Sequence, residues 1–274
     1  MTKVLVFGSA NIDFLAQINK MPDQGETIKS EYFTISFGGK GANQAIAAAK
    51  AGAKVTFVGA VGDDNYGNLI IDNLQAYGIN CQNIQTIPNK NTGMAMVLLH
   101  NKDNRIIINS GANDSLVYTS AFDQLIADHQ TILLQNEIPL AFNNSVIKKA
   151  RELGKTIIFN PAPAENLAGL NFAAVDFLTP NEHEFELLTE LKVSEIDKKA
   201  IVTLGEKGAK YKEQYFATEK VNVVDTTGAG DTFNGAFAAS LTQTNDLTQA
   251  IKKGLVAATK SVTYLGAQHQ QTKQ

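Results

Sequence analysis

The stretch KVLVFG at residues 3–8 is a short apolar run that ends at a glycine. Such a run is typical of a strand buried on both faces, because a strand with one wet face alternates apolar and polar residues. Similar runs occur at 54–62, 130–135, 155–160, 175–180 and 199–205. Helix-like segments lie among them, at 43–52, 66–79, 140–154 and 181–191. Strands that alternate with helices predict parallel βαβ units, and therefore an α/β fold in which helices flank a layered, mostly parallel sheet.

Two regions depart from this alternation and have strand-like composition without intervening helices. They cover residues 13–37 and 92–111, and the second is typical of a hairpin with NKDN at 101–104 as its turn. We expect them to form a small antiparallel β lid that protrudes from a single α/β domain spanning residues 1–274. Such a sheet exposes an apolar face unless it covers a ligand or another subunit, so it is also the expected interface of a homodimer.

The composition argues against several classes of protein. Lys and Arg number 24 against 27 Asp and Glu, and no basic cluster is interleaved with aromatic residues, so we expect no nucleic-acid partner. No apolar run approaches the ~20 residues of a membrane span, so we expect no membrane contact either. Cys81 is the only cysteine, which excludes an intramolecular disulfide and suits the reducing cytoplasm. The spacing of the four histidines does not match a metal site.

The stretch VDTTGAGDTFNG at 224–235 places Gly228, Ala229 and Gly230 at the start of a buried, helix-like segment. The first N–H groups of a helix lack backbone partners and favour anions. Asp231 then puts a carboxylate where a phosphate is expected to bind. The residues allow two interpretations: a carboxylate that caps the helix, or a general base beside an anion hole, as phosphoryl transfer to an alcohol requires. The glycines favour the second.

Two further turns carry polar side chains that suit a ligand. FGGKGANQA at 37–45 is a glycine-rich turn into a helix, but it is not a Walker A loop. It is either a tight turn with a helix cap or a close approach of the backbone to a ligand that Lys40 and Asn43 reach. GSANID, directly after the first strand, offers Asn11 and Asp13, an amide and a carboxylate that together suit the hydroxyls of a polyol. Gly-x-Gly-x-x-Gly does not follow that strand, which argues against a dinucleotide-binding fold.

Polar residues also follow later strands, and open α/β sheets bind ligands at the carboxyl ends of their strands. FNPAPAE and LTPNEHE each end such a strand. In the second, Glu182 either organises a metal through water or is an ordinary acid in a first helical turn. In VTLGEKGA at 202–209, Thr203, Gly205 and Gly208 either line a nucleotide site or merely form a turn.

Taken together and in order, these motifs resemble those of the ribokinase-like (PfkB) carbohydrate kinases. The similarity runs from VLVFGSANID and FGGKGANQAIAAAKAGAKVTFVGAVGDD through NSGAND, LLQNEIP, NPAPAE, LTPNE and VTLGEKGA to VDTTGAGDTFNGAF and YLGAQ, and it covers nearly the whole chain. The resemblance implies the fold of that family and an ATP-dependent sugar kinase, a phosphotransferase with an alcohol group as acceptor. The acceptor it favours is the 5-hydroxyl of D-ribose, with Mg²⁺ as a cofactor and K⁺ as an activating monovalent cation.

The resemblance also implies roles for individual residues. Asp231 is then the catalytic base, and the anion hole is formed by Gly228, Ala229 and Gly230. The residues expected to hold the sugar are Asn11, Asp13, Gly39, Lys40, Asn43 and Glu137. Contacts to ATP are expected from Asn160, Thr203, Gly205 and Gly208, and Glu182 is expected to act near Mg²⁺. The activating cation is expected to be enclosed by Asp225, Thr227 and the backbone near Ser261, Tyr264 and Gly266.

The chain departs from the family pattern in its second half. Leu255 stands where related kinases often carry Asn or His beside the adenine, and Gln270 replaces a residue, often serine, that helps to close the cation site. The segment at 191–200 is shorter than in the family and lacks a helix before the strand at 200. The alternatives are a kinase for another acceptor (deoxyribose, fructose or adenosine) and a sugar-binding protein with impaired catalysis.

Overall fold

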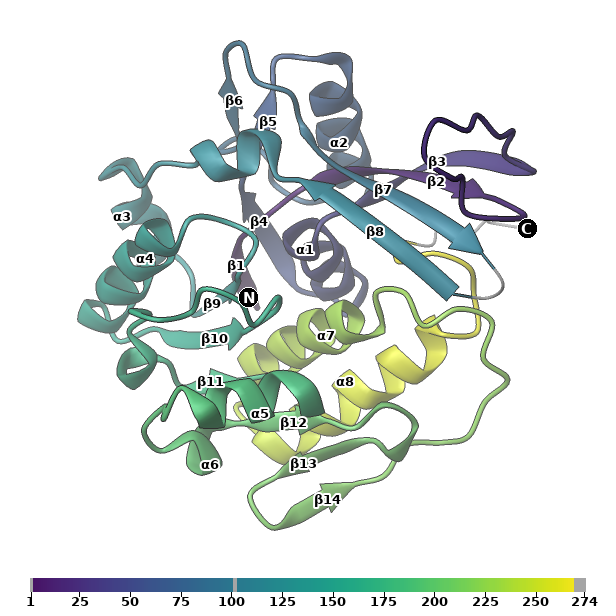
Figure 1. The fold of residues 1–274 in the computed structure, drawn as a ribbon. Coiled ribbons are helices and arrows are strands. Elements are labelled where there is room, and N and C mark those ends of the chain that lie inside the picture. Colours follow the sequence, from purple (N-terminus) through teal and green to yellow (C-terminus); the bar gives the residue numbers. More distant parts are fainter. Residues whose placement is uncertain (1, 101–102, 269–274) are drawn as a thin grey trace.

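The computed structural model describes residues 2–100 and 103–268. Its centre is a five-stranded sheet in the order β11-β10-β9-β1-β4 (Figure 1). The strands are β1 (Lys3–Phe7), β4 (Lys54–Val58), β9 (Thr131–Gln135), β10 (Thr156–Asn160) and β11 (Phe177–Leu178). Every pairing in this sheet is parallel. The predicted fold class, a mostly parallel sheet flanked by helices, is therefore confirmed.

Helices cover both faces of this sheet. Successive side chains of a strand point to opposite faces, and in β1 Val4 and Val6 pack with one layer of helices whereas Leu5 and Phe7 pack with the other. The first layer consists of α1 (Lys40–Lys50), α7 (Ala229–Thr244) and α8 (Leu247–Ser261). The second consists of α3 (Ala121–Ala127), α4 (Leu140–Glu152), α5 (Glu182–Glu190) and α6 (Ile196–Lys199) (Figure 1). None of the described helices combines the length and the apolar character that crossing a membrane requires.

A short antiparallel sheet extends the structure beyond β11. It contains β12 (Ile201–Thr203), β13 (Ala209–Tyr211) and β14 (Gln214–Phe216). Single parallel bridges join Ala200 to Leu178 and Thr203 to Asn181, so β12 runs beside β11. The 3-10 helix η3 (Gly205–Lys207) connects β12 to β13, which confirms the predicted strand, turn and strand at 202–209.

The predicted lid is a four-stranded sheet in the order β3-β2-β7-β8 (Figure 1). Its strands are β2 (Asn11–Gln17), β3 (Tyr32–Gly38), β7 (Gly93–His100) and β8 (Asp103–Asn109). Each hairpin-like pair is antiparallel, whereas β2 and β7, which join the two pairs, run parallel. Of the predicted turn, residues 101–102 lie outside the described residues. The 3-10 helix η1 (Gly111–Ser115) follows β8.

The predicted strand at 54–62 consists of two strands. β4 ends at Val58, and β5 (Ala60–Gly62) pairs in parallel with β6 (Gln85–Ile87) in a separate sheet. Between them lies Gly59, where a Cβ would be 2.6 Å from the carbonyl oxygen of Gly8. This close contact with the backbone after β1 marks the point where the chain leaves the central sheet. The next helix, α2 (Asn65–Ala76), has Asp64 as its N-cap.

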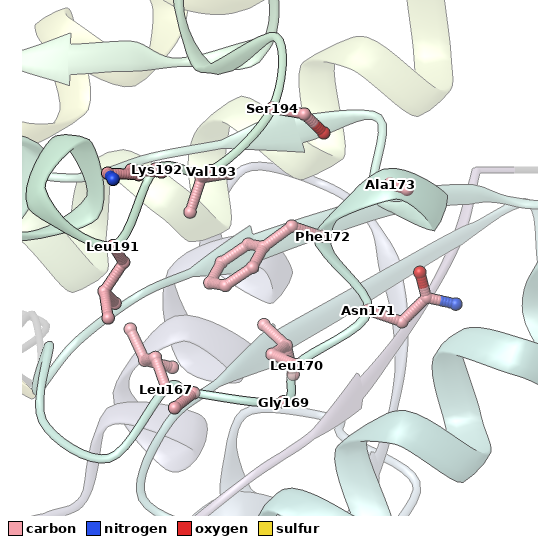
Figure 2. A pocket seen from close by; sticks show the side chains of 11 residues that line it. Leu167, Gly169, Leu170, Asn171, Phe172, Ala173, Leu191, Lys192, Val193 and Ser194 are labelled. Carbon is pink, nitrogen blue, oxygen red and sulfur yellow. The ribbon is translucent and has the colours of Figure 1, made fainter.

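The short segment at 191–200 forms only the single turn of α6. A hollow of about 440 Å³ lies beside it, against the 3-10 helix η2 (Phe172–Ala174). Figure 2 shows the apolar side chains of Leu167, Phe172 and Leu191 around this hollow. None of the predicted site residues lines it, so the shortened segment leaves a surface depression away from the predicted chemistry.

Candidate active site

A hollow of about 220 Å³ lies where α7 begins and where β10 and β11 end. Open α/β sheets place ligands at the carboxyl ends of their strands, so this is the expected position of a site. The predicted residues that line it are Lys40, Asn160, Thr203, Gly228, Ala229, Gly230 and Asp231. They come from β10, β12 and the starts of α1 and α7, so only the fold brings them together.

The start of α7 combines a bare backbone with a buried carboxylate. Its N-cap is Gly228, whose left-handed backbone (φ 72°) glycine adopts without steric cost. Asp231 lies in the first turn and is only 8% exposed. Its carboxylate is bonded by side chains of α1, not by the amides of its own helix. The geometry therefore argues against a capping role for Asp231. Because no side chain caps α7, its first N–H groups remain available to bind an anion.

Two amides hold the carboxylate of Asp231 from opposite sides. Asn43 donates its Nδ2 proton to Oδ2 at 2.9 Å, and Gln44 donates from Nε2 to Oδ1 at 3.0 Å. The residues are neighbours on α1, which packs directly on α7. Neutral donors orient the carboxylate and leave it able to accept a proton from a hydroxyl.

Gln44 is a site residue that was not identified from the sequence. It is fully buried, and its Nε2 also donates to Oδ1 of Asn160 at 3.0 Å. Its Oε1 accepts a bond from Nε2 of Gln135 at 2.8 Å. Asn160 in turn donates to the carbonyl of Thr179 at 2.9 Å, so its amide serves this network beneath the hollow. The signal was present in FGGKGANQA, but only the fold shows that the glutamine faces the base.

A second buried pair fixes the backbone in the first turn of α7. Thr179 donates its hydroxyl proton to Oδ1 of Asn234 at 2.5 Å, and Asn234 donates from Nδ2 to the carbonyl of Gly230 at 2.9 Å. Both side chains are about 1% exposed. Because a peptide group is planar, a fixed carbonyl at Gly230 also fixes the N–H of Asp231.

The predicted sugar residues of β2 lie beside Gly38 and Gly39, just before α1, where the lid joins the core. Oδ1 of Asn11 accepts a bond from Nδ2 of Asn113 at 2.8 Å, and Asn113, in NSGAND, is a second residue that the sequence did not single out. The carboxylate of Asp13 lies over Gly38, where a Cβ would be 2.2 Å from Oδ2. Burial, together with the nearby charge of Glu137, raises the pKa of Asp13 to about 6.

Glu137 and Lys40 connect the sugar side to the base. Oε2 of Glu137 accepts bonds from the Ser9 hydroxyl at 2.5 Å and from the backbone N–H of Lys40 at 2.9 Å. Lys40 follows Gly39, the N-cap of α1, whose φ is 88°. Burial lowers the pKa of Lys40, but the surrounding carboxylates, chiefly Asp231, outweigh it and raise that pKa above its usual value. The ammonium group thus stays charged near the carboxylate of Asp231.

Glu184, and not the predicted Glu182, is the acid of α5 that lines the hollow. Glu184 lines the hollow, forms a capping box with Asn181 (both bonds 2.8 Å), and has its pKa raised by burial. Glu182 is exposed and does not line the hollow. Two residues apart on a helix are about 200° apart around its axis, so the two side chains cannot face the same site. Of these two acids, only Glu184 lies where it could reach a ligand in the hollow.

The residues expected to bind the cation include a loop before α7 that is held by hydrogen bonds to Asp225. Oδ1 of Asp225 accepts bonds from the N–H and the hydroxyl of Thr227 at 2.9 and 2.6 Å, and Oδ2 accepts from the N–H of Gly266 at 2.8 Å. Ser261 ends α8, and Tyr264 lies in the turn between it and Gly266. Gln270 lies outside the described residues.

The expected nucleotide residues divide into two groups. Thr203 lines the hollow, whereas Gly205 and Gly208 shape the η3 turn with φ of 56° and 100° and do not line it. A Cβ at Gly208 would lie 1.9 Å from the carbonyl oxygen of Phe216, so glycine is required there. Leu255 is buried in the apolar cluster with Phe233 and offers no polar group to a nucleotide.

Within residues 2–100 and 103–268, no group of three or more His, Cys, Asp and Glu side chains is arranged to hold a metal ion. Mg²⁺ usually keeps several waters and is bound by one or two carboxylates together with substrate phosphates. Glu184 and Asp231 are the carboxylates that line the hollow. The donor set therefore fits an ion that arrives with a nucleotide.

The fold and the site together define an α/β phosphotransferase that acts on alcohol groups. The model of the pfkB family of carbohydrate kinases matches residues 1–274, and the chain belongs to that family. A ribokinase of Lactococcus lactis is 42% identical to it, over 98% of this chain and 93% of that protein. A deoxyribokinase of Salmonella typhi is 38% identical, over 97% and 94%. The structure of Arabidopsis thaliana ribokinase complexed with ribose and ATP matches with a TM-score of 0.89 and 31% identity, over 97% and 94% of the two chains.

Proposed function

We propose that this chain is an ATP-dependent kinase that phosphorylates the 5-hydroxyl of D-ribose. The observation that carries the proposal is the buried carboxylate of Asp231, held by Asn43 and Gln44 at the uncapped start of α7. The ribokinase at 42% identity and the ribose and ATP complex of the Arabidopsis enzyme support both the donor and the acceptor.

The chemistry assigns a separate task to each part of the hollow. Asp231 accepts the proton of the attacking hydroxyl, and its amide partners keep an oxygen aimed at that hydroxyl. The amides of Gly228, Ala229 and Gly230 stabilise the charge of the phosphoryl group as it moves. Lys40 adds a positive charge beside the base. Asn160 and Thr203 line the same hollow, which supports them as contacts to the nucleotide.

The sugar is held on the lid side of Asp231 in this proposal. Asn11, Asp13 and Asn43 offer amides and a carboxylate for its hydroxyls, and the backbone of Gly39 approaches it closely. Glu137 contributes through its contact with the start of α1. The expected result is a closed site in which the 5-hydroxyl alone reaches the base.

Two ions complete the proposal. Mg²⁺ enters with the ATP phosphates and neutralises their charge, with Glu184 as the nearest organising acid. K⁺ is held by Asp225 and by backbone carbonyls around Thr227, Ser261, Tyr264 and Gly266. Its contribution is to fix the loop that precedes the anion hole.

A homodimer through the lid is part of the proposal. The exposed fractions of Ile106, Ile107 and Ile108 on β8 are 52%, 64% and 56%. Met96 on β7 and Phe33 on β3 are similarly exposed. Apolar side chains gathered on one sheet in this way mark an interaction surface.

A kinase for 2-deoxy-D-ribose is the second candidate, because the Salmonella deoxyribokinase is 38% identical over almost the whole chain. The two acceptors differ by one hydroxyl. A site built to bond that hydroxyl discriminates strongly against the sugar that lacks it, because its buried polar groups are left unpaired.

A coupled assay of ADP release tests the proposal across D-ribose, 2-deoxy-D-ribose, D-fructose and adenosine. We expect the highest kcat/KM with D-ribose. A preference for 2-deoxy-D-ribose or another acceptor would show that the protein is a kinase but that ribose is not its acceptor. Ribose binding in calorimetry without ADP release would indicate a sugar-binding protein instead.

A further inference from the structure

The segment at 262–268, which follows α8, is anchored to the loop before the anion hole. The carbonyl of Val262 accepts bonds from the N–H groups of Val224 and Asp225 at 2.8 and 3.2 Å. The N–H of Gly266 donates to the carboxylate of Asp225 at 2.8 Å. The two ends of the turn at 262–266 are therefore fixed to the same short loop.

The next residue of the segment packs against the start of α7. A Cβ added at Gly228 would lie 2.5 Å from the Cβ of Ala267, so the two residues are in close contact. The chain thus crosses the start of α7, and Gln268 lies between α1 and α2.

Gln268 is bonded there through all its polar side-chain atoms. Its Nε2 donates to Oδ1 of Asn43 at 2.6 Å, and its Oε1 accepts a bond from Nδ2 of Asn73 at 2.8 Å. Its backbone carbonyl accepts a third bond from the hydroxyl of Tyr77 at 3.0 Å. Asn73 and Tyr77 lie at and just after the end of α2, so Gln268 links that helix to α1.

These bonds form a chain with a single direction. Asn73 donates to Gln268, Gln268 donates to Asn43, and Asn43 donates to Oδ2 of Asp231 at 2.9 Å. An amide side chain has one accepting and one donating end. Because the oxygen of Asn43 is engaged by Gln268, its nitrogen must face the carboxylate. A reversed Asn43 would place its own oxygen against the oxygen of Asp231.

We propose that Gln268 is a positioning residue for the catalytic base and acts through Asn43. This inference rests on the proposed function, since it takes Asp231 as the base. Its consequence is that the segment that bonds Asp225 and touches Gly228 also sets the orientation of the carboxylate. The loop before the anion hole and the base are thereby aligned by the same seven residues.

The first test replaces the donor of Gln268 by an acceptor, in Gln268→Glu. We expect kcat to fall at least tenfold while the KM for ATP stays within twofold, because Asn43 can no longer serve both neighbours. The same substitution in an Asn43→Ala background is expected to cause no further loss, since the residue through which Gln268 acts is gone. Additive losses in the double variant would overturn the proposal.

The second test reverses the chain from its far end. Asn73→Asp removes the donor to Gln268 and supplies an acceptor in its place. The amide of Gln268 is then expected to rotate so that its nitrogen faces the new carboxylate, and the amide of Asn43 is expected to rotate in response. Asn68, exposed on the same helix, provides the matched control Asn68→Asp, which adds the same charge. We expect Asn73→Asp to lower kcat at least fivefold with unchanged thermal unfolding, and Asn68→Asp to match the wild type. Equal kcat in the two variants would overturn the proposal even if Gln268→Glu does not fold.

The wild type is measured first, with the sugar that it turns over fastest. A failure with ribose therefore counts against the proposed acceptor, and the Gln268 variants are compared on the sugar that is used. If the wild type turns over no acceptor, the proposed function fails, and the inference, which takes Asp231 as the base, fails with it.

Discussion

At the scale of single residues, the carboxylate of Asp231 owes its position to amides that come from another helix. A carboxylate in the first turn of a helix is favoured by the helix dipole whether or not it does chemistry. Here the side chain is 8% exposed and is bonded by Asn43 and Gln44. A capping carboxylate would instead bond its own first turn, as Asp246 does with the N–H of Gln249 at 3.0 Å. The comparison indicates that the carboxylate of Asp231 does not serve to cap α7.

Asp231→Asn tests whether this carboxylate is the general base. Asparagine keeps the size of the side chain but cannot take a proton, and loss of a general base costs about 10²–10⁴-fold in rate. We expect kcat to fall by this factor while sugar affinity in calorimetry stays within a few-fold. Asp246→Asn is the matched control, which should leave both the unfolding temperature and kcat nearly unchanged, because asparagine caps a helix about as well as aspartate. Near-normal kcat in Asp231→Asn would exclude it as the base.

Asp13 gives the site a dependence on pH. Burial, with the nearby charge of Glu137, raises the pKa of Asp13 to about 6. The ionised form accepts bonds from sugar hydroxyls, so we expect sugar affinity to fall as the pH is lowered from 7.5 to 5. In Asp13→Asn the affinity should be low at both values and nearly independent of pH. The measurement is calorimetry of the sugar alone, and an unchanged pH dependence in Asp13→Asn would contradict this role.

The same pKa predicts an effect on stability. A carboxyl whose pKa is raised by folding binds more protons in the native state, so the stability it contributes is lost as the pH rises towards 6 and beyond. At pH 7.5 the fold therefore carries the cost of a partly buried charge. Asp13→Asn is expected to unfold at a higher temperature than the wild type at pH 7.5, and the difference should shrink at pH 5.

Site residues that lie in recognisable sequence motifs could be predicted. Residues whose contacts come from distant parts of the chain could not. Asp231, Lys40 and Asn43 could be proposed because glycine-rich turns mark them as site residues. Gln44 could not, because its partner Asp231 is far away in the chain and nothing local shows which face of α1 meets α7. The sequence predicts Glu182 near the metal, but Glu184 is the acid of α5 that lines the hollow, since a side chain's direction around a helix follows from the exact helix start.

At the scale of elements, the lid carries the apolar surface. β8 is an edge strand with β7 as its neighbour, and its isoleucines at 106–108 are exposed on both faces. An exposed edge strand of this kind is normally covered or interrupted by charge. In the proposed homodimer, the lid of a second copy covers this surface.

Ile107→Lys tests the lid interface. A charge at a residue that is 64% exposed in the single chain should leave the fold intact and oppose burial against a second copy. Light scattering at micromolar concentration is expected to show a dimer for the wild type and a monomer for the variant. Val117→Lys, at a position that is 62% exposed outside the lid, is the control and should stay dimeric. A monomeric wild type would contradict the proposal that the lid forms a dimer interface.

Most elements could be predicted because their apolar patterns are local. The central strands and the helices between them follow from runs such as KVLVFG, and the class of sheet follows from their alternation. The split at Gly59 could not be predicted, since it depends on a contact with Gly8, and neither could the parallel pairing of β2 with β7. Pairing between segments far apart in sequence is decided by the packed fold.

At the scale of the whole molecule, three separate parts of the chain converge on one reaction centre. α1 supplies the amides that hold the carboxylate of Asp231, and α7 supplies that carboxylate and a helix start without a side-chain cap. The segment at 262–268 bonds the loop at Asp225 and touches Gly228. A change in that loop is therefore expected to reach the anion hole directly.

The proposed K⁺ site provides a way to test this connection. A bound ion at Asp225 fixes the direction of the amides at 228–230, which matter most as charge develops in the transition state. We expect K⁺ to raise kcat more than it lowers the KM for the sugar. The assay compares K⁺, Na⁺ and a bulky organic cation at equal ionic strength. Identical kcat in all three would mean that the loop is held without an ion.

The central claim is that the chain transfers phosphate from ATP to the 5-hydroxyl of D-ribose, and phosphorus NMR of the product tests it most directly. A phosphate on C5 couples to the two protons of a CH₂ group, so the proton-coupled signal is predicted to be a triplet, absent when Asp231→Asn replaces the wild type. A doublet would place the phosphate on a carbon that carries one proton, such as C1. That result, or ATP consumption without any sugar phosphate, would contradict the account.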